Sequence, residues 1–243
     1  MPPLPSEAEP RPPEDFAPLL ATKEPVLLVG GQAVNLWALY YGKRTASLAP
    51  FVSRDVDVLG DRATLEALGK VAGTKPQFFP VKPPTNEIGV VIAKDHNGLP
   101  LLIEVLRYVH GVTNEELRDP VYTVAMGDTH VLLPGPIALL QAKIANVADI
   151  AQTGRQDARH VVILAQVIPA YVEDLLQAVV DERMDERKLV EFLERLLAVA
   201  ATSKARKVCK ELGLDPRQFF AGLDQTKLPK LSAFVEKRLP SIF

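Results

Sequence analysis

The stretch VLLVGGQAVNLWALYYG (Val26–Gly42) joins an apolar run to two glycines and a helical pattern, and SRDVDVLG follows at Ser53–Gly60. Pro25–Val29 is short, apolar and ended by glycines, which is typical of a buried strand. After Gly31, apolar residues recur at three- and four-residue steps, which predicts a helix closed by Gly42. In the second stretch two aspartates alternate with two valines, so we expect a strand with both carboxylates on one face.

Gly30 and Gly31 stand where the predicted strand meets the predicted helix. Such a turn presents backbone N–H groups and a helix N-terminus, which together favour a phosphate. The dinucleotide fingerprint needs G-x-G-x-x-G and the P-loop needs G-x-x-x-x-G-K-[ST], and GGQAVN satisfies neither. The turn therefore predicts a phosphate contact outside these two classes of protein.

Three carboxylates are candidate metal ligands. Asp55 and Asp57 share a strand face, and oxygen ligands of this kind suit Mg²⁺. Glu104 lies within the otherwise apolar LPLLIEVLRYV, where a charge is costly unless it is paired or metal-bound. If the two strands are neighbours, the three carboxylates converge and could hold two metal ions for an in-line displacement at phosphorus. The plainer alternatives are aspartates near a strand end and a Glu104 paired with a nearby arginine.

The periodicities predict an α+β fold in three parts: a disordered Pro-rich tail over 1–19, an α/β domain with a mixed sheet over 20–135 and a helical domain over 136–243. The 243 residues are 47% hydrophobic and 24% charged, as in an ordinary globular protein. Two hairpins are expected within the sheet, one with its turn at DHNGLP and one around the GD turn of VAMGDTHV. From Ile137 onward the apolar residues recur at helical steps.

Composition also excludes several classes of protein. A net charge of −2 and a pI of about 6.1 argue against a basic nucleic-acid binder, although the residues from Ala200 onward carry an excess of Lys and Arg. That basic end either meets a polyanion or is a solvated helical surface. With one cysteine, without an apolar leader and without a run of about 18 apolar residues, we expect a cytoplasmic protein that has no membrane partner.

The order of these features resembles the DNA polymerase beta-type nucleotidyltransferase superfamily, whose motif runs hG[GS], then DhDh, then h[DE]h. VGG, RDVDVL and IEV match these three parts in order. The chain is most similar to the AbiEii-type minimal nucleotidyltransferases, which include toxins of toxin–antitoxin pairs, over about residues 25–165. In LLPGPIALLQAKIANVADIAQTGRQDARHVVIL, Lys143 and Asp157 match a lysine and an aspartate of a later block in that group.

The resemblance implies a nucleotidyltransferase fold and an enzyme that moves an NMP from an NTP to an acceptor hydroxyl and releases pyrophosphate. The implied metal ligands for Mg²⁺ or Mn²⁺ are Asp55, Asp57 and Glu104, and Glu104 would also accept the acceptor's proton. Lys143 is implied to be catalytic and to contact phosphates. The implied nucleotide contacts are Gly30, Gly31, Gln32, Ser53, Lys143 and Asp157. Gln32 stands where the superfamily commonly has Ser or Thr, and Glu104 where it more often has Asp.

The expected partners are an NTP and an acceptor, for which a tRNA end, a protein hydroxyl and a small molecule all stay open. A toxin of this group would also have an antitoxin partner. Two alternatives remain beside this prediction. One is a non-catalytic member of the fold that binds a nucleotide or a protein, and the other is an enzyme that modifies a small molecule such as an aminoglycoside.

Overall fold

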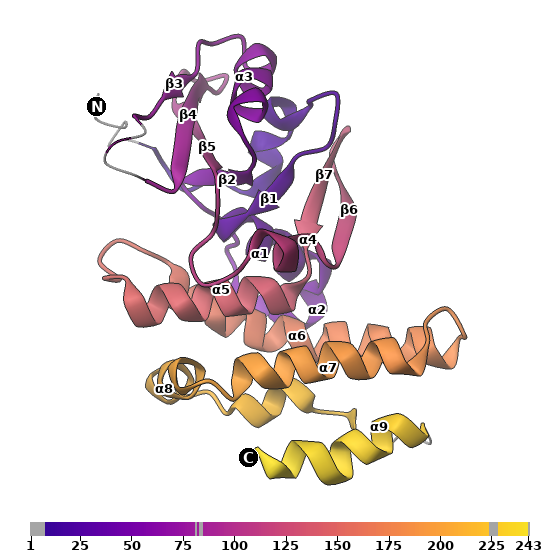
Figure 1. Cartoon of the computed structure of the whole chain (residues 1–243). Helices are drawn as coiled ribbons and strands as arrows, with labels where there is room; N and C mark the ends of the chain where they lie inside the picture. The colour runs from indigo at the N-terminus through magenta and orange to yellow at the C-terminus, as the bar shows by residue number, and fades with distance from the viewer. Residues whose placement is uncertain (1–7, 81, 83–84, 224–227, 243) are drawn as a thin grey trace. The chain divides into compact units, whose positions relative to one another are not determined.

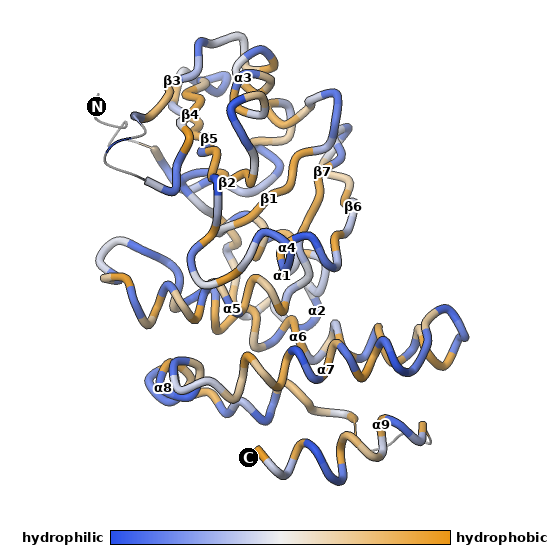
Figure 2. Tube along the Cα trace, viewed as in Figure 1, coloured by the Kyte–Doolittle hydropathy of each residue, from blue (hydrophilic) through white to orange (hydrophobic). Residues whose placement is uncertain are grey.

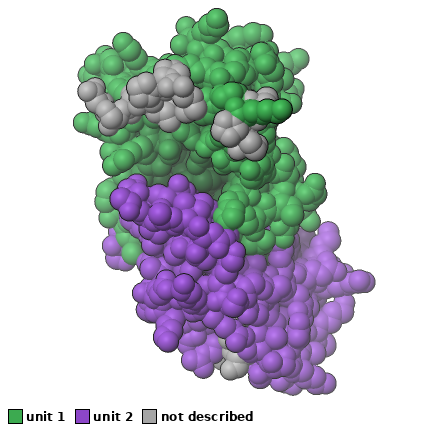
Figure 3. Space-filling model, turned by 60° about the vertical axis from the view of Figure 1, so that its left-hand side comes forward, with its two compact units in different colours: residues 1–40, 48–142 green, residues 41–47, 143–243 purple. Residues whose placement is uncertain are grey.

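The computed structural model describes residues 8–80, 82, 85–223 and 228–242 (Figure 1). The chain divides into two compact units, coloured separately in Figure 3. Unit 1 consists of residues 1–40 and 48–142, and unit 2 consists of residues 41–47 and 143–243. Unit 1 contains a seven-stranded sheet with helices and unit 2 is helical, so the predicted α+β class is confirmed.

The sheet of unit 1 has the strand order β3-β4-β5-β2-β1-β7-β6. Its strands are β1 (Leu27–Val29), β2 (Asp55–Leu59), β3 (Gln77–Phe78), β4 (Glu87–Lys94), β5 (Pro100–Leu106), β6 (Val121–Met126) and β7 (Thr129–Pro134). β2 runs parallel to β5, β1 runs parallel to β7, and the other neighbouring pairs are antiparallel. The hairpins β4–β5 and β6–β7 confirm both predicted hairpins. The trace of β1 is strongly apolar (Figure 2) and its three residues are buried, as in an interior strand of a sheet covered on both faces.

The helices of unit 1 lie between and after its strands in the chain. They are α1 (Gly30–Tyr40), α3 (Arg62–Val71), α4 (Asn114–Arg118) and the first half of α5 (Pro136–Asp149). Ala138 and Ala142 of α5 belong to an apolar cluster with Leu27, Val29 and Leu59 of the sheet. The first half of α5 therefore belongs to unit 1, and the predicted domain boundary at 135/136 comes too early.

The prediction that Gly42 closes the first helix is wrong. Helix α1 ends at Tyr40, and Gly42 begins the short helix α2 (Gly42–Thr45). Gly42 is not among the glycines with a positive φ, so it does not supply the left-handed conformation of a glycine C-cap.

The predicted disordered tail over 1–19 is wrong for residues 8–19, whereas residues 1–7 lie outside the described residues. Residues Pro13–Leu20 form the 3-10 helix η1, in which the side chains of Phe16 and Leu20 are fully buried. Arg11 forms an antiparallel bridge with Ser53, just before β2. The prolines and acidic residues of this segment suggested disorder, but two large apolar side chains offset the cost of ordering it.

Unit 2 is all helical in its described residues, as predicted. It contains α2, the second half of α5, α6 (Asp157–Val180), α7 (Glu186–Ala200), α8 (Ser203–Glu211) and α9 (Pro229–Ala233). Shorter helical turns complete it: η2 (Ala46–Leu48, which ends in unit 1), η3 (Pro216–Phe220), η5 (Phe234–Arg238) and η6 (Leu239–Ser241). Among the described residues, α6 alone is long and apolar enough to cross a membrane by length and composition. However, 61% of its apolar window is buried, as in the core helix of a folded protein.

Candidate nucleotide and metal site

The two strands that carry the predicted metal ligands are neighbours. β2 pairs with β5 in parallel, with Asp57 opposite Glu104 and Asp55 opposite Leu102. Neighbouring strands lie about 4.8 Å apart, and residues opposite one another project from the same face of a sheet. The carboxylates of Asp55, Asp57 and Glu104 therefore start from adjacent positions on one face, and all three residues are partly exposed.

Gly30 lies directly against one of these carboxylates. Val29, at the end of β1, is opposite Asp57, so the next residue turns away from the sheet beside the Asp57 side chain. A Cβ placed on Gly30 would lie 1.7 Å from Asp57 Oδ2, and the φ of Gly30 is +64°. Only glycine satisfies both conditions, because a side chain would clash with the carboxylate and would be strained at this φ. The glycine turn and the aspartate strand thus belong to one site.

Ser53 contacts a carboxylate as well. Its Oγ donates a hydrogen bond to Asp55 Oδ1 at 3.0 Å, and the residue is buried. Ser53 therefore fixes the orientation of Asp55. The contact between Ser53 and a nucleotide, which the family resemblance implies, stays a prediction.

Arg11 organises the site from outside the motif. Its backbone N–H donates to Ser53 O at 2.8 Å and its carbonyl accepts from Ser53 N–H at 3.0 Å. The same carbonyl accepts from Gln32 Nε2 at 2.9 Å, and the guanidinium pairs with Asp95 of the β4–β5 turn at 2.8 Å. Sequence reasoning missed Arg11, because these contacts join segments that are far apart in the chain and no local pattern signals them.

The side chain of Gln32 is fully buried and already bonded. It donates to the carbonyl of Arg11 and accepts from Asn35 Nδ2 at 3.0 Å. Gln32 thus ties the first turn of α1 to the N-terminal segment, a role that a shorter Ser or Thr side chain would not reach. Its side-chain contact with a nucleotide stays a prediction that would require these bonds to be exchanged.

The residues of this site suit a metal ion shared with a substrate. Among the described residues, no group of three His, Cys, Asp or Glu side chains is arranged to hold a metal ion. Mg²⁺, however, is usually bound by one or two carboxylates together with substrate phosphates and water, and seldom by an all-protein cage. Asp55 and Asp57, two residues apart on one strand face and next to the Gly30 turn, match that requirement in ligand type and number.

Lys143 and Asp157 form a buried ion pair in unit 2. Lys143 Nζ donates to Asp157 Oδ1 at 2.7 Å, Asn146 Nδ2 donates to the same oxygen at 3.1 Å, and Arg155 Nε donates to Oδ2 at 2.7 Å. Burial alone would raise the pKa of Asp157, but the Lys143 charge and these hydrogen bonds outweigh it and hold the pKa well below its usual range. Asp157 thus orients Lys143, and contacts of either residue with a nucleotide stay predictions.

His160 lies beside this ion pair, one helical turn after Asp157. It is buried, and neither ring nitrogen has a hydrogen-bond partner among the described residues. Burial, and then the positive charge of Lys143, lower the pKa of His160 to about 3. The ring is therefore neutral at physiological pH.

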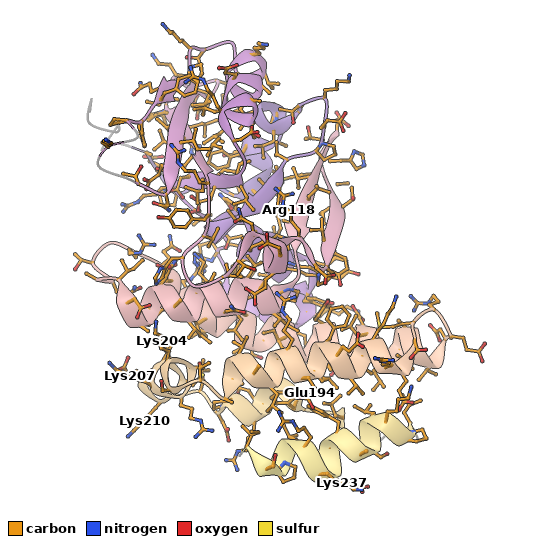
Figure 4. The ribbon with its side chains drawn as sticks, viewed as in Figure 1. Arg118, Glu194, Lys204, Lys207, Lys210 and Lys237 are labelled. Atoms are coloured by element: carbon orange, nitrogen blue, oxygen red, sulfur yellow. The ribbon has the colours of Figure 1, made fainter. Side chains whose placement is uncertain are left out.

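The excess of basic residues near the C-terminus is partly neutralised. Lys204, Lys207 and Lys210 extend from α8 (Figure 4). Lys204 pairs with Asp149, and Lys207 lies 4.0 Å from Glu211. Two of the three lysines thus have acidic partners, as on a solvated helical surface, and contact with a polyanion stays a prediction.

Comparison with known proteins gives one structural match. No protein-family model and no curated protein matches the chain. Among solved structures, it is similar to an antigenic nucleotidyltransferase-like protein from Paracoccidioides brasiliensis, at 15% sequence identity and a TM-score of 0.40. The match covers 65% of this chain and 78% of that one. The AbiEii-type resemblance stays a prediction.

Proposed function

We propose that the protein is a metal-dependent nucleotidyltransferase, which transfers an NMP from an NTP to an acceptor hydroxyl and releases pyrophosphate. One observation carries the proposal: the carboxylate of Asp57 lies against the Gly30 turn on one side and is in register with Glu104 on the other. A phosphate-binding turn and carboxylates in direct contact are the two parts that phosphoryl chemistry requires.

Each part has a distinct role in the reaction. Asp55 and Asp57 would hold a Mg²⁺ or Mn²⁺ ion, which would neutralise charge on the phosphates. The first N–H groups of α1, beginning at Gly30, have no acceptor within the helix and would bind phosphate oxygens. Glu104 would accept the proton of the acceptor hydroxyl. The acceptor oxygen would then form a bond to the α-phosphorus as the bond to pyrophosphate breaks.

The finer expectations rest on the family resemblance. Lys143, held by Asp157, would contact the phosphates of the NTP. The acceptor is a tRNA end, a protein hydroxyl or a small molecule, and a toxin-type enzyme would be controlled by an antitoxin. A cytoplasmic location agrees with the supply of NTP.

The proposal is tested by following label from each of the four α-³²P NTPs into tRNA, protein or aminoglycoside, with Mg²⁺, with Mn²⁺ and with EDTA. We expect transfer that requires the metal and falls at least about 100-fold in Asp57→Asn, since that carboxylate would be lost as a ligand. Asp128→Asn, in the exposed β6–β7 turn, makes the same change of charge elsewhere in unit 1 and should keep full activity. Undiminished transfer by Asp57→Asn would overturn the assignment.

A second candidate function is nucleotide binding without transfer. It is favoured by Gln32, which stands where the superfamily commonly has Ser or Thr and whose side chain is already bonded to Arg11 and Asn35. Metal-dependent binding of NTP, without labelled product from any acceptor, would support this candidate instead.

A further inference from the structure

A cavity of about 530 Å³ lies in unit 1 at the opposite end of β2 from Asp55. Its wall includes Leu27, at the start of β1, and Leu59, at the end of β2, which are opposite each other in the sheet. Arg107, which follows β5 directly, also lines it. The volume is within the range of about 300–1,000 Å³ that small-molecule sites occupy. None of the proposed nucleotide-site residues lines this cavity.

The cavity gathers cations that lack partners. Most arginines of this chain have an acidic or carbonyl partner. Among the described arginines, Arg54, Arg107 and Arg118 alone make no side-chain hydrogen bond or ion pair, and the last two line the cavity. Lys23, also in the lining, has no partner among the described residues either. Arg118 extends from the end of α4 (Figure 4), so the three cations come from three separate segments.

The acidic residues of the lining are fewer than the cations. Asp61 is occupied as the N-cap of α3, where its Oδ1 accepts from Thr64 N at 2.9 Å and from Thr64 Oγ1 at 3.1 Å. Those hydrogen bonds lower the pKa of Asp61 and keep Oδ1 engaged. Glu24 is exposed and is the other acid in the lining. The three cations therefore outnumber the acids.

The rest of the lining is suited to an organic molecule. Its floor is aliphatic: Val26, Leu27, Leu59, Ala63, Ala67 and Leu132. Asn114 donates its amide to the carbonyl of Arg107, but its Oδ1 is buried without a hydrogen-bond partner. A buried acceptor left unpaired is costly, and a hydroxyl or N–H group of a ligand would satisfy it.

We propose that this cavity binds a small organic anion with an apolar body and one phosphate or carboxylate head. The planar guanidinium groups of Arg107 and Arg118 suit both heads, because each can donate two parallel hydrogen bonds to an oxyanion. The aliphatic floor holds the apolar body, and removal of that surface from water adds to the affinity. The cavity shares no lining residue with the proposed nucleotide site.

The test is calorimetric titration of the full chain in EDTA, so that no divalent metal is present for the proposed nucleotide site. The complete probes are phenyl phosphate and benzoate. Inorganic phosphate and acetate represent the two heads alone, and phenol represents the aromatic body alone. We expect at least one of the two complete probes to bind at least about tenfold more tightly than its separate parts. Arg107→Gln and Arg118→Gln should each weaken that binding about tenfold or more, since each removes a charge-assisted hydrogen-bond pair.

Arg54→Gln is the matched control, because it removes an equally unpaired arginine outside the cavity. Ala67→Leu narrows the cavity without a change in charge and should weaken the complete probe. Preference for phenyl phosphate or for benzoate identifies the head. The proposal is overturned if neither complete probe has a dissociation constant about 10-fold below those of its parts. It is also overturned if Arg54→Gln weakens binding as much as Arg107→Gln and Arg118→Gln do.

Discussion

Substitution of Gly30 by alanine should weaken metal binding at the candidate site strongly while lowering the stability of the fold only modestly. Two costs follow from the structure. Alanine at φ +64° adopts the left-handed conformation, which costs about 1–2 kcal/mol. Its Cβ would also meet Asp57 Oδ2 at 1.7 Å, so the oxygen would have to retreat to the 3.4 Å at which ordinary contact begins. Since Mg²⁺ tolerates little departure from bond lengths of about 2.0–2.1 Å, Asp57 would no longer serve as its ligand.

Gly73 provides a matched control for this substitution. Its φ is +63°, it lies in unit 1, and a Cβ there would meet nothing within 4 Å. Gly73→Ala therefore introduces the same backbone strain without the clash. Both variants should lose about 1–2 kcal/mol of unfolding free energy in urea titrations monitored by circular dichroism. In Gly30→Ala the clash with Asp57 is relieved by movement of the carboxylate, so we expect the clash to reduce metal binding and not stability.

Metal binding would be measured by electron paramagnetic resonance of Mn²⁺ in the presence of ATP. We expect Gly30→Ala to weaken Mn²⁺–ATP binding at least about 100-fold, as misplacement of a site group by about 1 Å commonly does to function. Gly73→Ala should bind as the wild type does. If Gly30→Ala is folded and binds Mn²⁺–ATP with the affinity of Gly73→Ala, the inference that Gly30 and Asp57 form one metal site is refuted.

Three further predictions concern the buried polar contacts. His160, with a pKa of about 3 when folded and 6.5 as its ordinary value, binds a proton only in the unfolded chain between these pH values. Stability should therefore fall from pH 6.5 to 4.5, and His160→Gln should remove about 2 kcal/mol of that fall in urea titrations. Asp157→Asn leaves Lys143 buried without its counter-charge and should lower the free energy of unfolding by about 3–5 kcal/mol in urea titrations at pH 7. Because the pKa of Asp157 is lowered in the folded protein, the stabilisation by its carboxylate is present at neutral pH and is lost only in acid. Arg11→Gln should leave the fold intact but raise amide hydrogen exchange at Ser53 relative to Arg206→Gln, because the pair with Asp95 no longer holds the N-terminal segment.

Several features of the candidate site were predictable from the sequence because they are local. Alternation in β2 places Asp55 and Asp57 on one face whatever the rest of the fold does. Both hairpins likewise follow from short-range patterns. Gly42 shows the limit of such patterns, because a glycine after a helical run does not have to adopt the left-handed conformation of a cap.

Composition misled most at the N-terminus. Prolines and acidic residues usually accompany disorder, yet Phe16 and Leu20 are fully buried and Arg11 bridges to Ser53. The same segment explains Gln32, whose side chain bonds the carbonyl of Arg11 and therefore has a structural role at the start of α1. Neither residue signals the other, because 21 positions separate them in the chain.

The sequence by itself determined the strand, turn and helix around Gly30, both hairpins and which face of β2 is acidic, since these patterns depend on local backbone geometry. Only the tertiary structure decided that Glu104 is opposite Asp57 and that Gly30 lies against the Asp57 carboxylate. It also decided that Lys143 is held by Asp157. These contacts depend on strand order, register and helix packing, which the whole set of buried side chains selects together and no single stretch encodes.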